Sequence, residues 1–75
     1  MTGSAPVRSL SIEVNGRGCE VDAGTTVAQV VARWSPSPVG IAVARNGEVV
    51  PRSAWSSTGL CACDRVEIVS AVAGG

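Results

Sequence analysis

The sequence predicts one small two-layer α+β domain, in which a single helix packs on one face of a mixed β-sheet. Apolar and polar residues alternate in several short stretches, as they do in half-buried strands, and one other stretch repeats its apolar residues at helical spacing. Gly, Pro and Asn-Gly pairs separate these stretches. The 75 residues are enough for one domain and leave no room for a second core.

The first expected element is a β-hairpin. Apolar and polar residues alternate over residues 10–14, which is the period of a half-buried strand. Asn15-Gly16 is a strong hairpin turn signal. A second short strand should follow through Cys19 and Val21, whose spacing of two puts both side chains on one face.

A helix is expected after the break at Gly24. Thr26 and Gln29 have the spacing of a capping box, in which each side chain accepts a hydrogen bond from the backbone N–H of the other. Four apolar residues then follow at helical spacing, which predicts a stripe facing the core: Val27, Val30, Val31 and Trp34. The two prolines of the segment 35–38 should end the helix, because they lack a backbone N–H and favour extended geometry before them.

Two more strands should form a second hairpin. Ile41 and Val43 alternate with alanines, and Asn46-Gly47 marks a tight turn into Val49 and its neighbour. Pro51 cannot donate a ladder hydrogen bond, so it limits this fourth strand to an edge or an end.

The last part of the domain should contain one short turn and one strand. Residues 53–59 are expected to be irregular or to form a single turn, with Trp55 and Leu60 closing the underside of the core. Residues 64–69 alternate again, with Val66 and Ile68 facing inward. The predicted sheet therefore has four to five strands packed on one main helix.

Composition argues against several classes of function. Six Arg balance six Asp plus Glu, and no basic cluster stands out, so the usual electrostatic footprint of nucleic-acid binding is missing. There is no His and no Lys, which removes the commonest general base and the amine chemistries. No apolar run approaches the roughly 20 residues of a membrane span. We therefore expect a cytoplasmic protein that binds no nucleic acid, and we expect no metal site.

We expect three segments: a disordered leader over residues 1–8, a domain over 9–69, and an extended flexible tail over 70–75. Gly74 and Gly75 have no Cβ, so their backbone can thread a slot too narrow for side chains. The carboxylate of Gly75 becomes a good acyl donor once it is joined to AMP, and a sulfur nucleophile can then displace the AMP. The alternative is a frayed tail of small residues with no chemical role.

Four runs, in this order and spacing, resemble the ThiS family. These sulfur carriers of thiamine thiazole biosynthesis have a ubiquitin-like β-grasp fold. The resemblance extends from about Leu10 to Gly75, and it rests on residues 14–16, residues 23–28, residues 46–53 with Trp55, and residues 64–69 closing on Gly74-Gly75.

The resemblance implies a cycle that is carried out by other proteins. A ThiF-type, E1-like adenylyltransferase would use ATP and magnesium to adenylate Gly75. Sulfur from a cysteine desulfurase relay would then make the thiocarboxylate, and a ThiG-type thiazole synthase would take the sulfur. The chain would itself be a cosubstrate that binds no cofactor and has no active site.

The chain departs from the family just before its last strand. Where such proteins usually have a charged residue, an acid and a turn glycine, this sequence has Cys61-Ala62-Cys63, so Cys63 occupies a position where positive φ is expected. The two thiols could serve redox, persulfide or metal chemistry, or they could be small apolar filling of a turn. With Cys19 they number three, which is fewer than the four ligands of a structural zinc site.

Other residues are candidates for contacts with partners. Val69, Ala71 and Val72 are apolar with few obvious core roles, so we expect them to bind a partner on the exposed sheet face beside the tail. Two further pairs could also contact partners, but a core role is favoured for the tryptophans and a solvated one for the arginines: Trp34 with Trp55, and Arg45 with Arg52.

Three other functions remain open. A carrier for molybdopterin or cysteine synthesis would keep the chemistry and change the recipient, although residues 46–55 favour the thiamine branch. A ubiquitin-like modifier would form isopeptide bonds with lysines of other proteins. A structural interaction domain would not need its tail.

Overall fold

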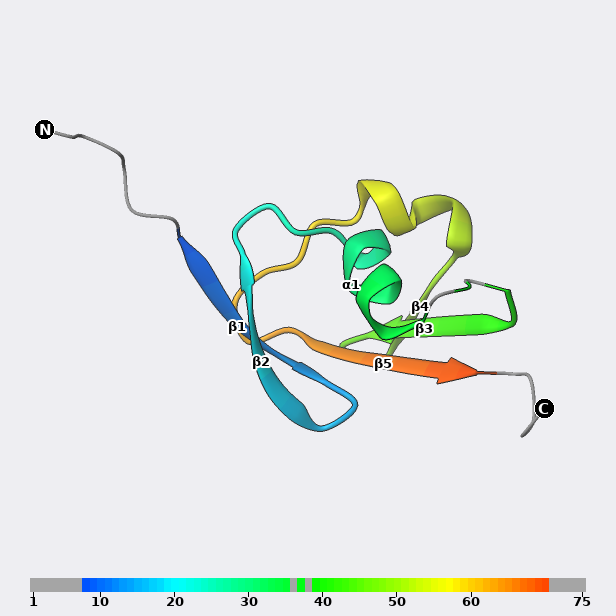
Figure 1. Cartoon of the computed structure of the whole chain (residues 1–75), viewed down its shortest axis with the longest axis horizontal. Coiled ribbons are helices and arrows are strands. Elements are labelled where there is room, and N and C mark those ends of the chain that lie inside the picture. Colours follow the sequence, from blue (N-terminus) through cyan, green and yellow to red (C-terminus); the bar gives the residue numbers. More distant parts are fainter. Residues whose placement is uncertain (1–7, 36, 38, 71–75) are drawn as a thin grey trace, which may run out of the picture.

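The computed structural model describes residues 8–35, 37 and 39–70. The α1 helix lies on one face of a five-stranded sheet, and the 3₁₀ helix η1 lies beside it (Figure 1). The elements in chain order are β1 (Ser9–Val14), β2 (Arg17–Asp22), α1 (Val27–Trp34), β3 (Ile41–Arg45), β4 (Glu48–Val50), η1 (Arg52–Ser57) and β5 (Arg65–Ser70). This is the predicted two-layer α+β arrangement.

The last strand occupies the middle of the sheet, whose order is β2-β1-β5-β3-β4. β5 runs parallel to β1, with Val14 opposite Val66, and antiparallel to β3, with Val43 opposite Ile68. β4 is an edge strand followed by Pro51, as the proline predicted. The first and the last strand of the domain therefore lie side by side in the sheet.

Both Asn-Gly pairs form the predicted tight turns. Asn15 and Asn46 have φ of 53° and 51°, and the glycines that follow have φ of 81° and 85°. Two successive positive φ values define the type I′ turn, whose twist suits a two-residue hairpin. The turns therefore fix the register of β1 with β2 and of β3 with β4.

The helix begins with the predicted capping box. The N–H of Gln29 donates to Oγ1 of Thr26 at 3.3 Å, and the N–H of Thr26 donates to Oε1 of Gln29 at 2.9 Å. Val27, Val30 and Val31 are buried, as predicted. These three valines attach α1 to the sheet.

The prediction that Trp34 completes the core stripe is wrong, because its side chain is 45% exposed. Trp34 is the last helical residue and lies about 10 Å along the axis from Val27, where less of the helix is covered. Trp55 of η1 supplies the core tryptophan and is 5% exposed. Its Nε1–H donates to the carbonyl of Val50 at 2.9 Å, so the indole packs without leaving its donor unpaired. Leu60 is also buried, as predicted.

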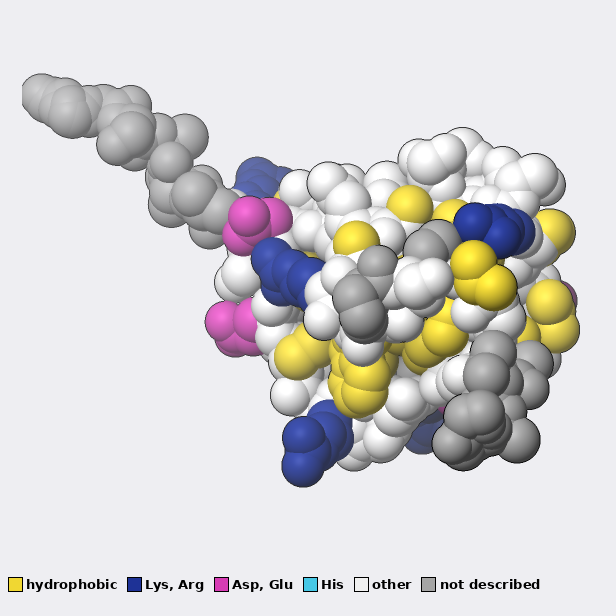
Figure 2. Space-filling view, turned by 45° about the vertical axis from the view of Figure 1, so that its right-hand side comes forward, with side chains coloured by type: hydrophobic (Ala, Val, Ile, Leu, Met, Phe, Trp, Pro, Cys, Tyr) yellow, Lys and Arg dark blue, Asp and Glu magenta, His cyan; other side chains and the backbone are white. Residues whose placement is uncertain are grey.

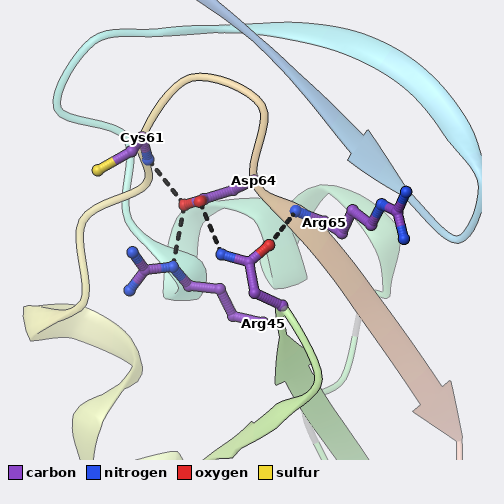
Figure 3. Close-up of polar contacts among 5 residues, drawn as sticks. Arg45, Cys61, Asp64 and Arg65 are labelled. Carbon is purple, nitrogen blue, oxygen red and sulfur yellow. Dashed lines mark hydrogen bonds and ion pairs between the residues drawn. The ribbon is translucent and has the colours of Figure 1, made fainter.

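A buried carboxylate connects the start of β5 to two other parts of the chain (Figure 3). Asp64 is 5% exposed and accepts three hydrogen bonds: from Nε of Arg45 at 2.9 Å, from Nδ2 of Asn46 at 2.9 Å, and from the N–H of Cys61 at 2.8 Å. Asn46 in turn accepts from the N–H of Arg65 at 2.9 Å. The expectation of a solvated Arg45 is therefore wrong, because Arg45 is half-buried and paired with Asp64 at long range in the sequence.

The same contacts set the charge state of Asp64. Burial acts to raise its pKa, because a carboxylate ion is poorly solvated there. Hydrogen bonds from Cys61 and Asn46 and the charge of Arg45 act in the opposite direction, and they hold the pKa of Asp64 below its ordinary value of 3.8. Because the folded-state pKa is the lower one, ionised Asp64 stabilises the fold above pH 3.8, and that contribution is lost as the pH falls through the folded-state pKa.

The turn before β5 contains the positive φ that the sequence predicts at Cys63, where φ is 68°. The Cys63 N–H donates to the carbonyl of Ser11 at 2.7 Å, which ties this turn to β1. A residue with a Cβ is disfavoured in this left-handed conformation. The turn therefore stores strain at a position where glycine would be relaxed.

We predict that Asp64→Asn lowers the free energy of unfolding by about 2 kcal/mol at neutral pH, because the amide loses charge-assisted hydrogen bonds and turns a donor toward other donors. The difference from wild type should shrink as the pH falls below 3.8, where the wild-type carboxylate takes up its proton. Urea unfolding at a series of pH values measures both effects. Glu20→Gln, at an exposed carboxylate, is the control, and a difference that stayed constant into the acid range would contradict this account.

We also predict that Cys63→Gly raises the free energy of unfolding by up to about 1 kcal/mol, because it relieves the left-handed backbone strain. Ala62→Gly is the matched control at an exposed neighbour without positive φ. That control should lower stability, since there glycine only widens the unfolded ensemble. Thermal unfolding compares the two variants, and destabilisation by both would show that Cys63 is not strained.

Candidate functional site

The candidate site lies where β5 ends. Val69 is the penultimate residue of β5 and is 59% exposed. The other predicted site residues lie outside the described residues: Ala71, Val72, Gly74 and Gly75. The structure therefore describes β5, which precedes the tail. Of the predicted partner contacts, Val69 lies within the described residues.

An apolar strip crosses the free face of the sheet next to this end. Val43 and Val66 face the core, so their neighbours along β3 and β5 face away from α1. Strand register places Ala42 opposite Val69, and Ala44 opposite Val49 of β4. The sheet-face strip comprises Ala42, Ala44, Val49 and Val69.

The strip is well exposed for so small a domain. Val49 is 77% exposed and Val69 is 59% exposed. Figure 2 brings forward the end of the molecule where β5 finishes, and it shows hydrophobic side chains at the surface in its middle and right-hand parts, with acidic side chains toward the left edge. Exposed apolar side chains that share one face are typical of a protein contact surface.

The end of β5 is held by Asn15, for which the sequence predicted a turn and no contact with this strand. Oδ1 of Asn15 accepts from the N–H of Ile68 at 2.8 Å, and Nδ2 of Asn15 donates to the carbonyl of Ile68 at 3.1 Å. These residues are 53 positions apart. The Asn-Gly pair predicts the turn, but the contact between the Asn15 carboxamide and Ile68 follows only from the position of β5 beside that turn.

An open hollow of about 620 Å³ lies on the same free face, near the two hairpin turns. Arg65 and Glu13 line it and form an exposed ion pair at 3.8 Å. Cys63 also lines it, and Cys61 and Cys63 are both exposed, so neither fills the interior. In the part of the chain that the structure describes, no three His, Cys, Asp or Glu side chains gather as a metal site.

Two of the remaining candidates lie on the helix side of the domain. Arg52 stacks over the ring of Trp55, with its guanidinium carbon 5.9 Å from the ring centroid. Trp55 itself is buried, so it contributes to the core and to this stacking. Of the helices described, none is long and apolar enough to cross a membrane.

Comparisons with known proteins agree with this architecture. The model of the ThiS family matches residues 11–75. A solved structure, that of the thiamine biosynthesis protein ThiS from Geobacter metallireducens, is 28% identical with a TM-score of 0.72, over 88% of this chain and 100% of the other. No curated protein matches the chain. The predicted β-grasp fold is confirmed, and the chain belongs to the ThiS family, the small sulfur carriers of thiamine biosynthesis.

Proposed function

We propose that this chain delivers sulfur for thiazole formation through a thiocarboxylate on Gly75. The observation that carries the proposal is the family match, which continues through Gly75 itself. The similar chain from Geobacter metallireducens is a thiamine biosynthesis protein, and this likeness favours the thiamine pathway over molybdopterin or cysteine synthesis.

The chemistry needs an activated carboxylate. A ThiF-type, E1-like enzyme transfers AMP from ATP, with magnesium, to the carboxylate of Gly75 and releases pyrophosphate. A persulfide of a cysteine desulfurase relay then displaces AMP and forms an acyl disulfide. A second thiol of the relay attacks that disulfide and releases the thiocarboxylate, from which a ThiG-type thiazole synthase takes the sulfur. Gly74 and Gly75 suit this cycle because a backbone without Cβ atoms fits a narrow channel to the reacting phosphate.

The body of the domain has a different task, which is to dock. From Ser70, an extended arm to Gly75 reaches roughly 17 Å, so the enzyme must hold the domain close to its own active site. The sheet-face strip is suited to this contact, because it is apolar and next to the start of the arm. Ala71 and Val72 would continue the contact along the arm.

We predict that incubation with ATP, magnesium, an E1-like partner and a desulfurase relay raises the intact mass of the chain by the difference between one sulfur and one oxygen atom. Deleting Gly75 should abolish the gain, because the reacting carboxylate is displaced by one residue. Deleting residues 1–7, the expected leader, is the matched control and should leave the gain unchanged. An unmodified wild-type chain in every pairing, or an equal gain without Gly75, would exclude this proposal.

We predict that Val49→Asp lowers kcat/KM for adenylation about tenfold, because a charge would be buried against the partner, while the free energy of unfolding changes little at so exposed a position. Val39→Asp is the control, since Val39 is also exposed, at 67%, and lies outside the strip. Equal effects of the two variants would assign docking to another surface.

A further inference from the structure

The two neighbours of β5 support it unequally. β3 pairs with it from Val66 to Ser70. On the other side, β1 pairs only through Glu13 and Val14, and the chain then turns away at Asn15. The ladder with β1 therefore ends at Val66, two residues before Ile68.

The side chain of Asn15 takes the place of the missing part of β1. The backbone N–H of Asn15 donates to the carbonyl of Val66 at 2.9 Å, which is the last main-chain contact between the β1 side and β5. Its carboxamide then both accepts from the N–H and donates to the carbonyl of Ile68. A carboxamide has the same donor and acceptor as a peptide group, so Asn15 extends the parallel ladder by one further step.

This contact depends on the turn conformation. With φ of 53°, Asn15 occupies the left-handed region that Asn tolerates better than most residues. Glycine would adopt the same turn more easily but would lack the carboxamide. The structure therefore uses Asn15 for a purpose that the turn alone does not require.

The position of the contact bears on the tail. Ile68 is two residues before the end of β5, and Val69 of the sheet-face strip follows it directly. A backbone residue that is already ordered before binding loses less conformational entropy when the chain binds, and a docking surface with a fixed shape binds more tightly.

We propose that Asn15 is a positioning residue for adenylation, which holds the end of β5 extended before the E1-like partner engages it. The inference rests on the proposed function. Because Asn15 orders the free chain, loss of its side chain should raise the KM for adenylation. Once the chain is docked, the partner holds the tail, and kcat stays close to the wild-type value.

Asn46 provides a matched comparison. It occupies the same kind of turn, with φ of 51° and a following glycine, and its carboxamide also contacts β5. That contact is at Arg65, the first residue of the strand, far from the tail. Asn46 also donates to Asp64, so Asn46→Gly should cost at least as much overall stability as Asn15→Gly while leaving the end of β5 in place.

The experiment combines amide hydrogen exchange with adenylation kinetics on the full chain. Asn15→Gly should speed exchange of the Ile68 amide at least tenfold relative to the buried helix amide of Val30, and it should raise KM about tenfold with kcat within twofold. Asn15→Asp keeps the acceptor and loses the donor, so it should raise KM to a smaller extent and provides a test if the glycine variant does not fold. Asn46→Gly should leave both KM and the Ile68-to-Val30 exchange ratio unchanged.

An unchanged KM in Asn15→Gly, or an equal rise in Asn46→Gly, would overturn the assignment while leaving the sulfur-carrier function intact. Unchanged exchange at Ile68 would also overturn it, since the carboxamide would then not hold the strand. A wild-type chain that no E1-like partner adenylates would overturn the proposed function, and this inference with it.

Discussion

The fold depends on placing its last strand in the middle of the sheet, and the buried carboxylate of Asp64 fixes where that strand begins. The Asp64 carboxylate accepts hydrogen bonds from the N–H of Cys61, from Nδ2 of Asn46 and from Nε of Arg45. Burial of a carboxylate costs free energy unless hydrogen-bond donors surround it. The donors around Asp64 come from the end of β3, from the turn after it and from the turn before β5. A β5 shifted by one residue would leave the charge without its donors and turn Val66 away from the core.

The far end of β5 is held by neutral hydrogen bonds and lies beside an exposed apolar strip. This difference would suit the proposed function, in which the tail acts inside another protein. The body stays fixed through the central strand, while the surface next to the tail is free for a partner. Among the described residues, the core beneath this surface consists mainly of valines, with one buried tryptophan.

Local signals in the sequence predicted most of the fold. Alternation located the strands, the Thr26–Gln29 spacing located the start of the helix, and the family resemblance anticipated the positive φ at Cys63. The exposure of Trp34 was missed because periodicity gives the direction of a side chain but not how far its neighbours extend. The Arg45–Asp64 pair and the Asn15–Ile68 contact join residues far apart in sequence, so no local pattern could reveal them. Of the candidate site, Val69 could be compared with the structure, whereas Gly74 and Gly75 lie outside the described residues.

The central claim is that the carboxylate of Gly75 is the group that an E1-like enzyme activates. ATP–pyrophosphate exchange measures that step directly, because adenylation must be reversible for label to return to ATP. The chain should support exchange, and the same chain extended by one alanine after Gly75 should not, although its domain folds as before. Equal exchange with the extended chain would contradict the account, since the carboxylate of Gly75 would then be locked in a peptide bond.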